Sequence, residues 1–208
     1  MGRPGLCFLC LLCLAVSGCT AQLRPESPQP VFYALDSKPA VFSCPNSFRD
    51  NLRVWEFFTS SPYNRTGMAV VNPSGEIVFS NTHQWADLPG IMVAEVLQRD
   101  LGRSGLFPLV FLGLPSIASG FELSGRVHEL SCRQSQEGRR AVLKADVSLM
   151  SLKQQPRLLL SKTYTLRSQP LTVKTSSKFA QAVDNLVREL SLHLQEDLCR
   201  VAARPDDS

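Results

Sequence analysis

Hydrophobic and polar residues alternate with a period of two through the middle of the chain, a pattern typical of strands with one buried and one wet face. Three segments show this alternation, at 121–128, 143–150 and 158–166. Short turn-like stretches at 137–138 and 154–156 separate them. Because such short connections join neighbouring strands, we expect an antiparallel meander.

Shorter apolar runs precede this meander. The segment 52–59 is rich in Val, Trp and Phe and predicts one continuous strand. Segments 68–71 and 76–80 flank an Asn-Pro-Ser-Gly turn sequence and predict a hairpin. A further short strand is expected at 106–112.

Two stretches repeat their apolar residues at helical spacing. The first covers 92–101; we expect Asp87 to cap it, Pro89 to lie in its first turn, and Gly102 and Gly105 to end it. The second covers 178–201. Its apolar stripe has the clearest periodicity in the chain: Phe179, Ala182, Val183, Leu186, Val187, Leu190, Leu194 and Leu198.

The order of the elements is strands and a helix, followed by strands and a second helix. This order predicts an α+β fold, with a mixed, mostly antiparallel sheet and two helices packed on one face. We divide the chain into a signal peptide at 1–18, a Pro-rich tether at 19–31, one folded domain at 32–202, and a disordered tail at 203–208.

The N-terminus has the layout of a secretory signal peptide, with Arg3 ahead of an apolar run from Leu6 to Val16. That run is too short to span a bilayer, which takes about 20 apolar residues. The Val-Ser-Gly-Cys sequence ending at Cys19 resembles the lipobox of bacterial lipoproteins. In such signals the cysteine is lipidated and becomes the new N-terminus, so we expect lipidation at Cys19. The alternatives are an ordinary signal peptide and an uncleaved anchor.

Charge and cysteine spacing narrow the function classes. The net charge of +4 comes from interspersed residues and is too weak and scattered to predict nucleic-acid binding. After Cys19, the mature chain keeps Cys44, Cys132 and Cys199, without zinc or redox spacing. A disulfide between two of them and a free buried thiol both fit this arrangement, and the pairing stays open.

Nothing in the sequence favours catalysis. None of His83, His128 and His193 has a second histidine at helical spacing, and we expect no metal and no cofactor. Cys132 and His128 would lie about 13 Å apart on a strand, at about 3.3 Å per residue, too far for a nucleophile and its base. Nucleophile-elbow and phosphate-loop sequences are missing. We expect a protein that is not an enzyme and has no catalytic residue.

The sequence around Trp85, which precedes the first helix, has two interpretations. In one, Trp85 packs against that helix as part of the core. In the other, Trp85, together with Tyr63 and Pro89, contacts a partner near the sheet edge.

Several short motifs follow the lipobox in a defined order: Tyr33-x-Leu35, Leu52-x-Val54-x-x-Phe57, Tyr63, Trp85-Ala86-x-x-Pro89, Leu101-x-x-Ser104-Gly105-Leu106-Phe107 and Phe121-Glu122-Leu123-x-Gly125-x-Val127. Together they resemble the ABC-type transport auxiliary lipoprotein family, which includes the PqiC lipoproteins. The resemblance extends over 33–200. Leu88 departs from it, since many relatives have a second proline there.

The resemblance implies a non-catalytic component of an intermembrane transport system for phospholipids or other hydrophobic molecules. Its implied partners are an ABC permease, an ATPase and an MCE-domain protein that bridges the envelope. Thr20 stands where an Asp would retain an enteric lipoprotein at the inner membrane, so the outer membrane, facing the periplasm, is favoured. Self-association into a homo-oligomer is left open. The rival functions are a lipoprotein module that regulates a cell-wall synthase and an envelope hydrolase.

Overall fold

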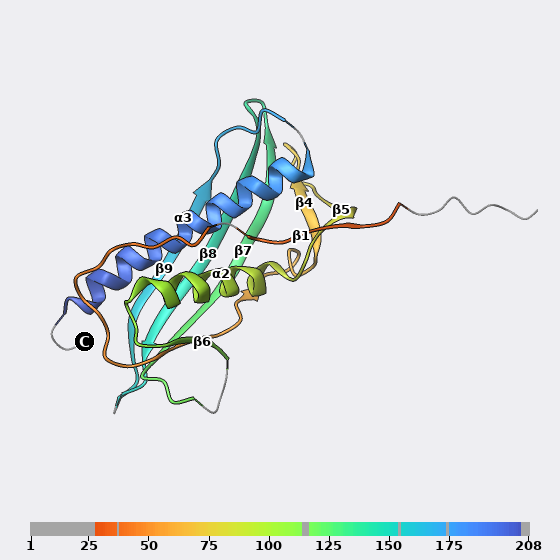
Figure 1. The fold of residues 1–208 in the computed structure, drawn as a ribbon. Coiled ribbons are helices and arrows are strands. Elements are labelled where there is room, and N and C mark those ends of the chain that lie inside the picture. Colours follow the sequence, from red (N-terminus) through yellow and green to blue (C-terminus); the bar gives the residue numbers. More distant parts are fainter. Residues whose placement is uncertain (1–27, 37, 114–116, 154, 174, 205–208) are drawn as a thin grey trace, which may run out of the picture.

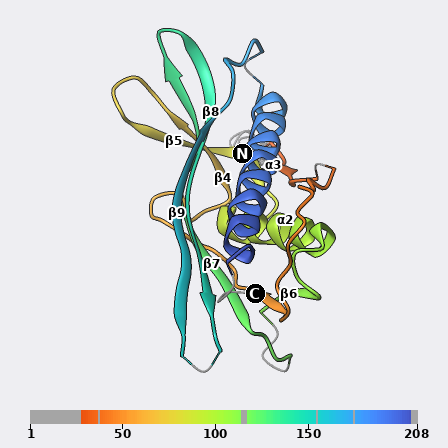
Figure 2. The same ribbon diagram turned by 90° about the vertical axis from the view of Figure 1, so that its left-hand side faces the viewer.

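The computed structural model describes residues 28–36, 38–113, 117–153, 155–173 and 175–204. These residues form a large open sheet with two helices on one face (Figures 1 and 2), which confirms the predicted α+β fold. The helices are α2 (Pro89–Ser104) and α3 (Ser176–Ala202). The strands are β1 (Val31–Tyr33), β2 (Leu52–Val54), β3 (Phe58–Thr59), β4 (Gly67–Val71), β5 (Ile77–Trp85), β6 (Val110–Leu112), β7 (Phe121–Ser135), β8 (Gly138–Ser151) and β9 (Arg157–Arg167).

The predicted meander is present as β7, β8 and β9, and it forms the long part of the sheet. All three strands pair antiparallel, with Leu123 opposite Leu149 and Leu149 opposite Leu160. Each strand is longer than the alternating segment in the sequence. The last three residues of β7, 133–135, are polar and exposed, so hydrophobic alternation does not mark them.

Three short strands lie one after another along the other edge of β7. β2, β3 and β4 all run parallel to it, at Phe121–Leu123, Arg126–Val127 and Ser131–Arg133. β6 then pairs with the outer side of β2, while β5 pairs with β4 and β1 pairs with β5. The sheet is therefore mixed, with its long ladders antiparallel and its short additions parallel.

The predicted strand at 52–59 is wrong as one element, because it divides into β2 and β3. The chain leaves the sheet between them, and Trp55 N still donates to Leu123 O at 2.9 Å. Phe57 leaves the strand line to enter the core, where it is 3% exposed. The predicted hairpin between β4 and β5 is confirmed, although β5 continues to Trp85.

The two helices follow their apolar stripes. Every residue of the predicted α3 stripe is buried, and Thr175 caps the helix by accepting a hydrogen bond from Lys178 N. The predicted Asp87 cap of α2 is wrong. Leu88 occupies the N-cap position, and Asp87 instead accepts a hydrogen bond from Leu88 N at 2.6 Å. The helix also continues through Gly102 and ends at Gly105, whose φ of 74° suits glycine.

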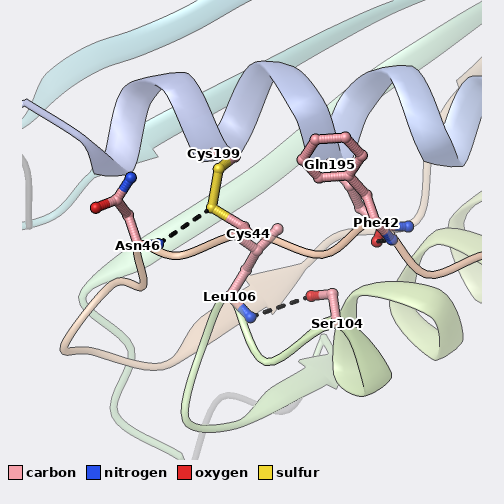
Figure 3. The surroundings of a disulfide bond; sticks show 7 residues. All are labelled: Phe42, Cys44, Asn46, Ser104, Leu106, Gln195 and Cys199. Atoms are coloured by element: carbon pink, nitrogen blue, oxygen red, sulfur yellow. Dashed lines mark hydrogen bonds between the residues drawn. A yellow bond between two sulfur atoms is a disulfide. The ribbon is translucent and has the colours of Figure 1, made fainter.

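Residues 34–36 and 38–51, between β1 and β2, lie over the helices as a strap (Figures 1 and 3). Gln195 of α3 binds it twice, accepting from Phe42 N at 2.8 Å and donating to Ala40 O at 2.8 Å. One turn further along α3, Cys199 forms a disulfide with Cys44. This settles the open pairing, since Cys132 is the buried free thiol.

Candidate functional site

The sheet has a notch beside β3. On its outer side β2 carries β6, and β4 carries β5, whereas β3 pairs only with β7 among the described strands. The first turn of α2 lies next to this notch, and Gly90 N donates to Thr59 Oγ1 at 2.8 Å. The arrangement leaves a surface depression between strands that are far apart in the sequence.

Two glycines hold Phe57 at the base of the notch. A Cβ on Gly90 would lie 2.0 Å from Phe57 O, and a Cβ on Gly125 would lie 2.3 Å from the Phe57 ring. Both separations are far below van der Waals contact, so only glycine permits this approach of helix, loop and sheet. Gly90 and Gly125 therefore fix the shape of the depression.

The depression is a groove of about 830 Å³ with mostly apolar walls. Its size lies within the range of ligand and partner pockets. The apolar walls come from the loop after β2, the start of α2 and the end of β8: Trp55, Phe57, Phe58, Leu88, Ile91 and Met150. We call this surface the notch groove.

Two aromatic side chains of the notch groove are notably exposed. Phe58 is 71% exposed and Trp55 is 39% exposed. The apolar surface continues onto β9, because Met150 stands opposite Leu158, which is 56% exposed. Contiguous exposed apolar side chains of this kind are typical of interaction surfaces.

Two arginines and two glutamates surround the apolar walls of the notch groove. The guanidinium of Arg53 lies 5.4 Å from the Trp55 ring centre and pairs with Glu122 at 2.9 Å. Arg126 lies over Phe58 at 5.6 Å. The carboxylates lining the groove are Glu56 and Glu122. Since Arg53 neutralises Glu122, Glu56 remains as the exposed acidic group without an ion pair among the described residues.

The three residues predicted to contact a partner are buried. Trp85 is 1% exposed and packs on Phe179 of α3, with ring centres 5.6 Å apart. Pro89 is buried at the start of α2, and Tyr63 is 8% exposed. This packing fits the core interpretation of Trp85, and a partner contact through these three side chains stays a prediction. Cys19, the predicted lipidation site, lies outside the described residues.

Sequence reasoning missed Trp55 and Phe58 as surface residues. Their composition predicted a strand, in which alternate side chains would enter the core. The visible signal was a cluster of aromatic residues in a short segment, but the break in that strand depends on Gly90 and Gly125. Leu88, the position that departs from the family pattern, also lines the groove.

A hydrogen-bonded chain on the outer face of the sheet resembles hydrolase machinery. His128 Nε2 lies 2.5 Å from Asp146 Oδ2, and Ser60 Oγ lies 3.4 Å from His128 Nδ1. Hydrogen bonds from Thr163 and then from His128 lower the pKa of Asp146. The hydroxyl contact is long, and the three side chains do not line the notch groove.

A second cleft of about 500 Å³ lies between the segment after β9 and the first half of α3. Its walls are mixed, with Arg167, Lys178 and Glu189 among them. In the part of the chain that the structure describes, no three His, Cys, Asp or Glu side chains gather closely enough to hold a metal ion. No described helix is long and apolar enough to cross a membrane.

Comparison with known proteins identifies the family. The model of the ABC-type transport auxiliary lipoprotein component family matches residues 59–194, well over half of the chain. The chain therefore belongs to this family of auxiliary components of ABC-type transport systems, which places it in the cell envelope. The search of curated proteins finds no match.

Solved structures show the same fold. Protein XCC0632 from Xanthomonas campestris, a DUF330 family member, superposes with a TM-score of 0.75 at 16% identity, covering 86% of this chain and 99% of that one. The hypothetical protein CT253 from Chlamydia trachomatis gives 0.53 at 9% identity, covering 74% and 99%. An uncharacterized protein gives 0.59 at 13%, covering 78% and 99%. At such low identity, these likenesses establish the fold alone.

Proposed function

We propose that this chain is a lipid-anchored, non-catalytic docking subunit of an ABC-type system that moves phospholipids between the membranes of a bacterial envelope. The family match over 59–194 carries the proposal. The partners are an ABC permease, its ATPase and an MCE-domain protein that spans the envelope. The subunit holds part of this assembly at the membrane through its anchor.

Anchoring follows from the N-terminal sequence. Acyl chains on Cys19 insert into the outer membrane, and the Pro-rich tether lets the domain reach into the periplasm. The Cys44–Cys199 disulfide supports this location, because disulfides persist in oxidising compartments outside the cytosol.

The notch groove is the contact surface in this proposal. Its occupant is an apolar segment of the protein partner that carries a Lys or Arg beside its anchoring side chain. The aromatic walls provide the buried contact, and Glu56 provides the complementary charge.

Co-purification tests the functional proposal. The full chain, tagged at its C-terminus, is cross-linked in cells and purified from solubilised membranes, and the recovered proteins are identified by mass spectrometry. We expect the ABC permease, the ATPase and the MCE-domain protein, at levels well above a tagged unrelated lipoprotein. Enrichment of a cell-wall synthase, or of further copies of this chain alone, would overturn the proposal.

A further inference from the structure

The native disulfide does not join consecutive cysteines, because a third cysteine lies between its two partners in the sequence. Cys44 pairs with Cys199 across 155 residues, and Cys132 lies between them. The chain enters its compartment N-terminus first, so Cys44 and Cys132 meet an oxidising environment before Cys199 does. The first pair available for oxidation is therefore a wrong one.

Chain entropy also favours the wrong pairs. Bridges from 44 to 132 and from 132 to 199 close shorter loops than the native bridge. Because the probability of loop closure falls as about the 3/2 power of loop length, each wrong bridge forms about two to four times more often in an unfolded chain. Export order and entropy thus act in the same direction.

Neither wrong bridge is compatible with the fold. Cys132 lines a small cavity with Phe179 near the start of α3, whereas Cys44 is bonded near the end of that helix. Phe179 and Cys199 are about 30 Å apart along α3, at about 1.5 Å per residue. Since a disulfide requires Cα atoms within about 7 Å, a bridge to Cys132 excludes the native packing.

We propose that this chain is a substrate of a disulfide isomerase, which converts bridges to Cys132 into the native Cys44–Cys199 bridge. An oxidase disulfide first takes two electrons and two protons from Cys44 and Cys132, and becomes a dithiol. The isomerase thiolate then attacks the Cys44 sulfur and releases Cys132 as a thiol. Cys199 next attacks the same Cys44 sulfur as a thiolate and frees the isomerase. This second stage has no net oxidation.

The folded chain protects the product. Cys132 lies opposite Ala141 on β8 and Val70 on β4, and it is 4% exposed. Burial raises the pKa of its thiol, which lowers the thiolate fraction available for attack. Once the sheet and α3 have packed, the third cysteine no longer exchanges with the native disulfide.

The test expresses the full chain in cells with and without their envelope disulfide isomerase. Free thiols are blocked in the intact cells, and bridged peptides are quantified by mass spectrometry. Without the isomerase, we expect the native bridge in wild-type protein to fall several-fold while bridges to Cys132 accumulate. Cys132→Ala and Cys132→Ser, which cannot form a wrong bridge, should reach the native bridge without the isomerase.

Two results of this experiment would refute isomerase dependence. The first is wild-type protein that keeps its full amount of native bridge in cells without the isomerase. The second is a pair of Cys132 variants that still need the isomerase to form the native bridge. If both variants are too unstable to recover, pulse-labelled wild-type chains decide the question. Bridges to Cys132 among the earliest oxidised chains support the proposal, and a native bridge from the first time point overturns it.

Discussion

The backbone of Gly90 lies closer to the backbone of Phe57 than any residue with a side chain at position 90 would allow. A Cβ on Gly90 would lie 2.0 Å from the carbonyl oxygen of Phe57, and 2.8 Å from Thr59 Oγ1. The start of α2 is thereby seated directly on the backbone between β2 and β3. This contact links helix, sheet and notch groove.

Gly90→Ala tests that contact. The added methyl must displace backbone rather than a flexible side chain, so we expect a loss of about 1–3 kcal/mol in the free energy of unfolding. Gly102→Ala on the same helix is the matched control, since its Cβ would meet only Val110 Cβ at 3.9 Å. The control should be neutral or stabilising by about 0.5–1 kcal/mol. Urea unfolding measures both, and equal stability of the two variants would disprove the contact.

Trp85 should act through the core. Trp85→Ala removes a side chain packed between the sheet and Phe179, so we expect a loss of about 3–5 kcal/mol in stability. Trp55→Ala, at an exposed position, should lower stability far less. Thermal unfolding of both variants gives the answer, and a Trp85→Ala protein that melts like wild type would restore the partner-contact interpretation.

Acid stability should depend on Asp197. Burial raises the pKa of Asp197, but hydrogen bonds from Lys162 and Tyr164, both at 2.7 Å, and the charges of Lys162 and Arg200 outweigh it, so the pKa falls below its ordinary value. The resulting stability is present above the unfolded pKa, about 3.9, and is lost as pH falls through the lower folded pKa.

We therefore expect wild type to exceed Asp197→Asn in stability at pH 7, and the difference to shrink as pH falls below about 4. Glu196→Gln, at the adjacent exposed carboxylate, serves as the control and should leave the profile unchanged. Unfolding midpoints between neutral and acid pH provide the measurement. A difference between wild type and Asp197→Asn that stays constant with pH would rule out this role.

The membrane anchor should depend on one atom, the Cys19 sulfur. Cys19→Ser removes the thiol that is acylated, so the variant should leave the membrane fraction or keep its signal peptide uncleaved. Cell fractionation and mass spectrometry of the N-terminal peptide distinguish these states. Cys13→Ser, within the apolar run, is the control and should stay anchored. A processed Cys19→Ser protein that remains in membranes would contradict lipidation at this position.

Much of the fold could be predicted from local patterns. The α3 stripe and the alternation in β7, β8 and β9 depend on burial of one face, which the sequence records residue by residue. The ends of helices and strands were harder to predict than their positions. Asp87 looked like a helix cap, but Pro89 lets α2 begin with Leu88 in extended backbone at the N-cap, so Asp87 binds only its neighbour's N–H.

The notch groove and the cysteine pairing could not be predicted from local sequence patterns. The groove exists because β3 lacks the outer neighbour that β2 and β4 have, a property of strand order rather than of any one segment. The strand at 52–59 breaks because Phe57 packs between two distant glycines. Cys44 meets Cys199 because the strap lies along α3, which no local spacing encodes.

Docking through the notch groove is tested most directly by substituting Phe58 and measuring recovery of the ABC permease with the tagged full chain. Phe58→Asp should reduce recovery at least several-fold while leaving the melting temperature unchanged, since Phe58 is 71% exposed. Phe32→Asp, at a 60% exposed position on β1, should recover the permease like wild type. Full recovery with Phe58→Asp, or loss only with Phe32→Asp, would contradict the notch groove as the docking surface.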